Sequence, residues 1–236
     1  MLALAREAWA AIRGVDRRVA AVCCAGALVA LLDNYQGSNG FFREVRWGGA
    51  PPLAADVYWF GASFVLWFVL PLAGLVLARQ PLREYGVGLG DARAGAGVAA
   101  ALLAVMLPVI FVASRSPAFY TQYPMSVSAR AGGRTLLVYE LFQVGYFVGW
   151  EFLWRGLFVN GLGRRVGAAN AILLSMVPFA VMHAGKPEAE ALGSIPAGIA
   201  LGMLAWRTRS FWWGALLHVA AAASMDLFAL LHRPAA

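Results

Sequence analysis

The uncharged stretch Ala94–Ser114, AGAGVAAALLAVMLPVIFVAS, decides the fold class of this chain. A helix needs about 20 apolar residues to cross the hydrocarbon core of a bilayer, and this stretch is long enough. It is also apolar on every side, which is typical of a membrane span and not of a surface helix of a soluble domain. The sequence therefore predicts a membrane protein.

The composition agrees with this prediction. The chain has 236 residues, of which 61% are hydrophobic and 13% charged, and its mean hydropathy is +0.68. Soluble domains average about 45–50% apolar and 25% charged residues. This excludes a soluble globule, a disordered chain and a disulfide scaffold. The net charge of +7 comes from scattered arginines without a dense basic run, so we expect a lipid bilayer and no nucleic acid as partner.

The remaining apolar stretches extend the prediction to an all-α polytopic membrane helix bundle of about seven transmembrane helices. The loop 33–56 would add an eighth span if it dips into the bilayer. We expect 1–236 to form a single integral membrane domain, because no internal repeat divides it. The expected spans are Val19–Leu32, Val57–Ala78, Ala94–Ser114, Thr135–Leu162, Val166–Met182, Ala191–Trp206 and Phe211–Leu231.

The distribution of basic residues predicts the orientation of this bundle. Eleven basic residues fall on one side and seven on the other when the N-terminus is placed inside, which favours that orientation. Residues 1–18 combine apolar and Arg side chains, so we expect a short interfacial helix there. The abundance of Ala, Gly and Arg indicates a GC-rich bacterial genome, hence a bacterial cytoplasmic (inner) membrane.

Polar residues inside the expected spans are candidates for function. A charged group in a membrane helix costs at least about 2.5–3.5 kcal/mol on insertion scales, so such residues face the bundle interior and mark functional sites. All of them occur in the last hundred residues, which predicts a polar cavity built by the C-terminal helices. The set is Glu140, Glu151, Arg155, His183, His218 and Asp226, with Glu190 near a span boundary.

Spacing predicts which of these groups meet. Glu151 and Arg155 lie four residues apart and share one helix face, so we expect an ion pair. Glu140 shares that face but lies roughly 16 Å away along the helix axis, outside the same site. His183 falls at the outer end of its expected span and His218 nearer the cytoplasmic half, so these spans place the two histidines at different depths. Either the helices are bent, or the span limits are wrong by several residues.

Three motifs in order resemble those of the CAAX protease and bacteriocin-processing (CPBP) family of intramembrane proteases. Trp150–Gly156, WEFLWRG, is similar to the first motif, EExxxRG. Phe179–His183, FAVMH, is similar to FxxxH, and His218–Ala222, HVAAA, is similar to HxxxN. The resemblance covers the helices of 135–232, and the Trp-Glu-Phe form of the first motif resembles a bacterial sorting-peptidase (myxosortase-like) branch.

The resemblance implies a glutamic intramembrane endopeptidase acting near the anchor or C-terminal region of a membrane-anchored protein or peptide. It implies that Glu151, with His183, activates water, and that His218 stabilises the oxyanion beside Arg155 of the first motif. These four are the expected catalytic residues. A buried carboxylate suits a general base, and histidines suit water orientation or donation.

Two departures from the family pattern leave alternatives open. Trp150 stands where the first motif has its first Glu, and Ala222 stands where the third has its Asn. Either Glu151 is the base with shifted geometry, or the acids are relocated to Glu190 or Asp226, or the chain is inactive.

An inactive chain would act as a scaffold, immunity factor or chaperone, whereas a proton relay through the same acids would indicate a transporter. A divalent metal on the Glu and His side chains is a further alternative, but we expect no cofactor. The expected ligands come from separate helices and no HExxH pair exists.

Overall fold

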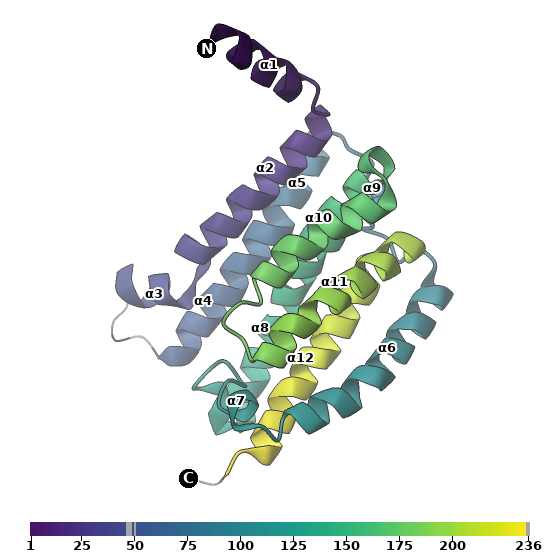
Figure 1. The fold of residues 1–236 in the computed structure, drawn as a ribbon. Helices are drawn as coiled ribbons and strands as arrows, with labels where there is room; N and C mark the ends of the chain where they lie inside the picture. The colour runs from purple at the N-terminus through teal and green to yellow at the C-terminus, as the bar shows by residue number, and fades with distance from the viewer. Residues whose placement is uncertain (46–48, 50, 235–236) are drawn as a thin grey trace.

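The computed structural model describes residues 1–45, 49 and 51–234. Its described residues form helices, turns and loops without a β-strand, which confirms the all-α polytopic bundle. Figure 1 shows α2 and α4 on one flank, α6 on the other, and α10, α11 and α12 between them.

Five helical segments are long and apolar enough to cross a membrane. Each corresponds to an expected span with its ends moved by a few residues, since helical turns continue past the apolar core into the boundary. They are α2 with the π-helical turn η1 (Arg17–Leu32, Asp33–Gly37), α4 with η2 and α5 (Pro52–Phe64, Val65–Val69, Leu70–Leu77), α6 (Ala92–Ala113), α11 (Glu188–Thr208) and α12 (Trp212–His232).

A central helical segment runs without interruption through α8 (Gly133–Glu151), the π-helical η5 (Phe152–Asn160) and α9 (Gly161–Val166). The expected span Thr135–Leu162 is therefore too short at both ends. Every residue of η5 is buried, because α10, α11, α12 and η2 pack around it. Seven of its residues are apolar or glycine, whereas Arg155 and Asn160 carry polar side chains that are buried by the same packing.

The short helix α10 (Ala168–Val181) corrects the depth expected for His183. At 1.5 Å per residue its 14 residues rise about 21 Å, which is less than the roughly 30 Å core of a bilayer. His183 follows α10 directly and contacts the rings of Trp150 and Phe179, and His218 of α12 contacts the same two rings. The two histidines therefore share one region, so the different depths that the expected spans gave them are wrong.

The N-terminal part adds elements at the surface of the bundle. Helix α1 (Leu2–Arg13) stands clear of the other helices in Figure 1. The expected interfacial segment 1–18 is too long at its end, because α2 already begins at Arg17. Asp16 caps α2: its carboxylate accepts hydrogen bonds from the backbone amides of Arg18 and Val19. Within 33–56, helix α3 (Asn39–Val45) has seven residues, too few to cross a bilayer.

Short elements close the remaining loops. They are η3 (Leu82–Tyr85), α7 (Pro117–Tyr120) and η4 (Ala129–Ala131). Residues of η3 contact η5 at the end of the bundle where α2 begins. α7 packs against α12, near the C-terminal end of the chain (Figure 1).

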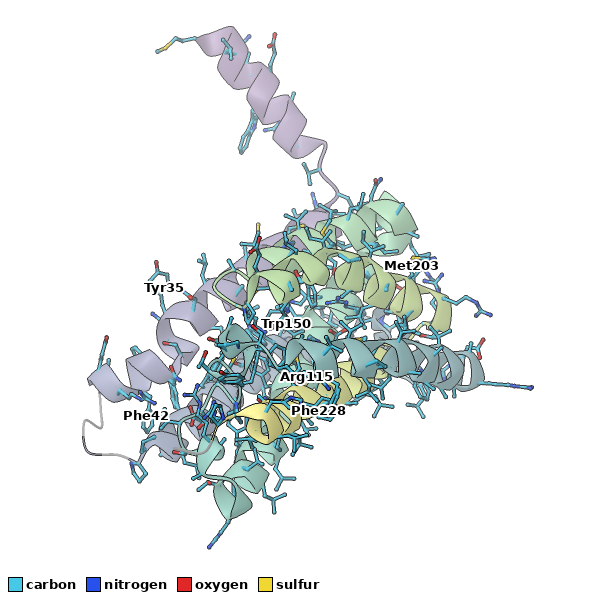
Figure 2. The ribbon with its side chains drawn as sticks, turned by 60° about the horizontal axis from the view of Figure 1, so that its bottom comes forward. Tyr35, Phe42, Arg115, Trp150, Met203 and Phe228 are labelled. Atoms are coloured by element: carbon cyan, nitrogen blue, oxygen red, sulfur yellow. The ribbon has the colours of Figure 1, made fainter. Side chains whose placement is uncertain are left out.

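Aromatic rings fill the core around the central segment. Trp67, Trp150 and Phe152 are at most 4% exposed and pack edge to face with their neighbours. Figure 2 shows Trp150 among the helices in the middle of the bundle, whereas Tyr35 and Met203 lie on its outside. Aromatic rings therefore surround the polar motif of the central segment.

Candidate active site

Glu151 lies at the junction of α8 and η5 with no exposed surface. One carboxylate oxygen, Oε1, lies 3.0 Å from Nδ1 of His218 on α12. The other, Oε2, lies 3.3 Å from Nε of Arg155. The predicted ion pair is present, and a histidine from another helix completes the surroundings of the carboxylate.

Gly214 allows α12 to approach this carboxylate. A Cβ atom at Gly214 would lie 2.6 Å from Glu151 Oε2, closer than the two groups can come without movement. The sequence analysis missed this residue. Its signal is a glycine four residues before His218, hence on the same helix face.

Arg155 is fully buried within η5. Its guanidinium carbon lies 4.1 Å from the centroid of the Phe179 ring, a cation–π distance. Its Nη1 and Nη2 atoms have no hydrogen-bond partner among the described residues. The charge is balanced by Glu151 and by the face of Phe179, so the three side chains must be ordered together.

His218 is the accessible member of the pair with Glu151. Its side chain is 16% exposed, against 0% for that of Glu151, and its ring stacks on Phe147 with centroids 4.2 Å apart. A carboxylate only accepts hydrogen bonds, so in the neutral imidazole Nδ1 carries the hydrogen and Nε2 keeps a lone pair.

His183 has the same arrangement with a different acceptor. Its Nδ1 lies 2.7 Å from the backbone carbonyl of Phe179, so Nδ1 is the donor and Nε2 of the neutral ring keeps a lone pair. Both histidines contact the same two rings, those of Trp150 and Phe179. The structure thus brings Glu151, Arg155, His183 and His218 together in one region.

Trp150 occupies the position of the first glutamate of the motif. Its ring centroid lies 5.9 Å from that of His183 and 6.3 Å from that of His218, and it is 4% exposed. The indole Nε1 has no hydrogen-bond partner among the described residues. A buried donor without a partner is costly, so this N–H is available to a bound group.

Among the described residues, none of the accessory acids makes a hydrogen bond or ion pair with Glu151. Asp226 accepts from Nε2 of Gln143 at 3.4 Å, and its carboxyl adjoins that of Glu140. Glu140 is therefore outside the Glu151 site, as its distance along the helix predicts. No hydrogen bond or ion pair between Asp226 and Glu151 occurs in the described part of the chain.

Glu190 connects two loops at the start of α11. It accepts from the Tyr123 hydroxyl at 2.5 Å and pairs with Lys186 Nζ at 3.0 Å. Burial, and next the Glu190 carboxylate, raises the pKa of Tyr123, so its hydroxyl stays protonated and donates. The structure gives Glu190 a cross-linking geometry and does not bring it to Glu151.

The residues of this site do not fit a divalent metal. Among the described residues, no group of three His, Cys, Asp or Glu side chains is placed to hold one. The Glu151 oxygens face His218 and Arg155, which leaves two imidazole nitrogens. Catalytic zinc commonly takes three protein ligands.

The comparisons with known proteins agree with the motif analysis. The family model described as type II CAAX prenyl endopeptidase Rce1-like matches residues 133–224, from the start of α8 into α12. This segment contains all three motifs, and the recognition of a CPBP-type domain is confirmed for it. Neither the curated proteins nor the solved structures give a match.

Removal of one partner from the buried pair tests its role in the fold. We expect Arg155→Met to cost about 3–5 kcal/mol of stability, because it leaves the Glu151 charge buried and unpaired. The double variant Glu151→Gln/Arg155→Met should recover part of this loss, since it leaves no lone charge. Unfolding in detergent, followed by tryptophan fluorescence, gives both values.

Arg207→Met is the matched control, because Arg207 pairs with Asp91 at the surface. Exposed pairs contribute little, so its unfolding curve should coincide with that of the unchanged protein. Equal stability of Arg155→Met and Arg207→Met would contradict the structural role of the buried pair.

Proposed function

Because residues 133–224 carry an Rce1-like domain of the CPBP family, we propose that this integral membrane protein is an endopeptidase acting within the bilayer. It hydrolyses a peptide bond near the membrane anchor or C-terminal region of a protein substrate. The observation that carries the proposal is the contact between Glu151 and His218, with His183 against the same aromatic rings.

The two histidines activate the water in this proposal, and Glu151 positions one of them. Glu151 holds the Nδ1 hydrogen of His218, which leaves Nε2 free to take a proton. A water between Nε2 of His218 and Nε2 of His183 can donate one hydrogen to each. Its oxygen lone pairs then remain free for attack on the peptide carbonyl carbon.

The proton balance follows from these positions. As the water oxygen bonds to the carbonyl carbon, His218 Nε2 takes one of its protons and Glu151 stabilises the resulting imidazolium. Collapse of the tetrahedral intermediate breaks the C–N bond, and His218 returns that proton to the leaving amine. The second water proton leaves with the new carboxyl group.

The negatively charged oxygen of the tetrahedral intermediate requires a hydrogen-bond donor. Ala222, which stands at the position of the motif's Asn, cannot supply one because it has no polar side chain. The buried indole N–H of Trp150, in contrast, lacks a partner and lies beside both histidines. We assign this N–H to the substrate carbonyl oxygen. Preorganised donors of this kind act on the charge that develops in the transition state.

The orientation and cell location belong to the same proposal. The excess of basic residues at the end where α2 begins favours that end on the inside of a bacterial cytoplasmic membrane. That the protein belongs to the myxosortase-like branch remains a prediction from the Trp-Glu-Phe form of the first motif.

A second candidate is a non-catalytic scaffold, favoured by Trp150 and Ala222 in place of the motif's Glu and Asn. In that case the Glu151–Arg155 pair would be kept for packing alone. Partner capture that persists in variants lacking both histidines, without cleavage by the unchanged protein, would favour this candidate.

We expect His183→Ala, His218→Ala and Glu151→Gln each to reduce cleavage of an anchored substrate expressed in the same cells to a small residual rate. Substrate size on gels measures the result. If Glu151 acts only through His218, the double variant Glu151→Gln/His218→Ala should be no slower than His218→Ala, since residues that act as a unit are not additive.

The control for these variants is Asp33→Asn. Asp33 is also a buried acid, bonded to Ser63 at 2.6 Å, but it lies outside the site. It should retain cleavage at equal expression. Cleavage that survives Glu151→Gln would show that His218 does not need the Glu151 carboxylate, and it would overturn the positioning role assigned to Glu151.

A second prediction concerns the indole donor. Trp150→Phe keeps a ring but removes the N–H, so we expect a loss of about 10²-fold in kcat, as when one oxyanion donor is removed. Trp154→Phe is matched to it, because Trp154 is 2% exposed and its Nε1 also lacks a partner. Equal rates in the two variants would contradict the role of Trp150.

Chelation tests the metal-free proposal. We expect EDTA and 1,10-phenanthroline to leave the rate of the purified protein unchanged, because the site offers only two free imidazole nitrogens. A loss of activity that returned with added Zn²⁺ would contradict this expectation.

A further inference from the structure

A polar cavity of about 490 Å³ lies at the end of the bundle where α2 begins and α9 ends, apart from the candidate active site. Arg18, Arg164 and Arg165 line it, together with Glu84 and Asn160. Its residues come from α2, η3, η5 and α9, so the packing of four separate elements creates it.

The cavity carries an excess of positive charge. Glu84 pairs with Arg18 at 3.2 Å and with Arg164 at 3.4 Å, and Arg165 pairs with Asp16. Three guanidinium groups therefore face two carboxylates. Each arginine uses only Nη1 in these ion pairs, although a guanidinium has five N–H donors.

Asn160 adds a buried polar group without a partner. It is 1% exposed, it lines the cavity, and neither its amide nitrogen nor its amide oxygen has a hydrogen-bond partner among the described residues. Native proteins pair nearly all such groups, so an unpartnered buried amide beside three arginines is available to a bound polar group.

The position of the cavity matches the headgroup layer of a membrane. Arg18 lies in the first turn of a candidate span, Arg17–Gly37. Helix α1 extends from the same end in Figure 1, and its exposed Trp9 stacks under Arg13 at 5.3 Å, as expected of a helix on a lipid surface. An anionic headgroup would therefore reach the cavity directly.

We propose that this cavity binds a phosphate group, carried by an anionic phospholipid headgroup or free in solution. Guanidinium groups match phosphate oxygens in geometry and charge, and the Asn160 amide nitrogen adds a neutral donor. Glu84 is neutralised by its two arginine partners and so does not repel the anion. The proposal is independent of the peptidase function.

Binding to the purified full-length protein in a neutral detergent tests the proposal. Phosphatidylglycerol, phosphatidylcholine and glycerol 1-phosphate are added separately, and the unfolding temperature and the bound lipid, counted by native mass spectrometry, are recorded. We expect a saturable rise with phosphatidylglycerol and none with phosphatidylcholine. A rise with glycerol 1-phosphate as well identifies the phosphate alone as the ligand, and its absence identifies the lipid.

Three variants locate the binding. Arg165→Gln and Asn160→Leu should each weaken phosphatidylglycerol binding at least fivefold, whereas Arg207→Gln, at a surface ion pair outside the cavity, should not. Asn160→Leu should leave the lipid-free unfolding temperature equal or higher, because an apolar side chain of similar size replaces an unpaired amide. Equal binding by all variants, or no binding by the unchanged protein, overturns the proposal.

Discussion

The Glu151 carboxylate and the Arg155 guanidinium share an environment without exposed surface, and the remainder of the site is arranged around that constraint. Removing two charges from water is costly, and their mutual attraction compensates only when the geometry is good and further partners are present. His218 and the Phe179 ring are those partners. Four helical elements must therefore keep their register to hold one ion pair.

This constraint also determines which groups are left for chemistry. Both oxygens of Glu151 face other side chains, so the carboxylate orients the His218 ring and has no oxygen directed at another group. The backbone carbonyl of Phe179 holds His183 in the corresponding way. Two imidazoles whose Nδ1 atoms face acceptors therefore direct two Nε2 lone pairs elsewhere, beside the Trp150 that stands at the position of the motif's first glutamate.

Sequence reasoning succeeded where one physical property dominates locally. Uncharged apolar stretches located the spans, and the spacing of Glu151 and Arg155 located the ion pair, because both depend on near neighbours in the chain. It failed for the relative depth of His183 and His218, which depends on how α10 and α12 pack around Trp150 and Phe179. Contacts between helices, such as Gly214 with Glu151, depend on packing that no local pattern encodes.

The sequence pattern does not predict the π-helical η5 either, because residues 152–160 would form an α-helix equally well. π-helical turns widen a helix and often occur at functional sites. Here η5 begins beside Glu151, contains Arg155 and ends at Asn160, so the same irregular segment connects the buried pair to the basic cavity.

The central segment of α8, η5 and α9 carries polar side chains at several positions along its axis. Glu151 lies 12 residues after Tyr139, an α-helical rise of about 18 Å, and η5 and α9 continue the chain to Arg165. Tyr139 accepts from Gln143, which also donates to Asp226, whereas Arg165 lines the basic cavity. Glu151 therefore lies between these two polar regions of the central segment. A single helical segment thus carries polar groups toward both of its ends and a buried ion pair between them, where charge is costly and only a cooperative set of partners can retain it.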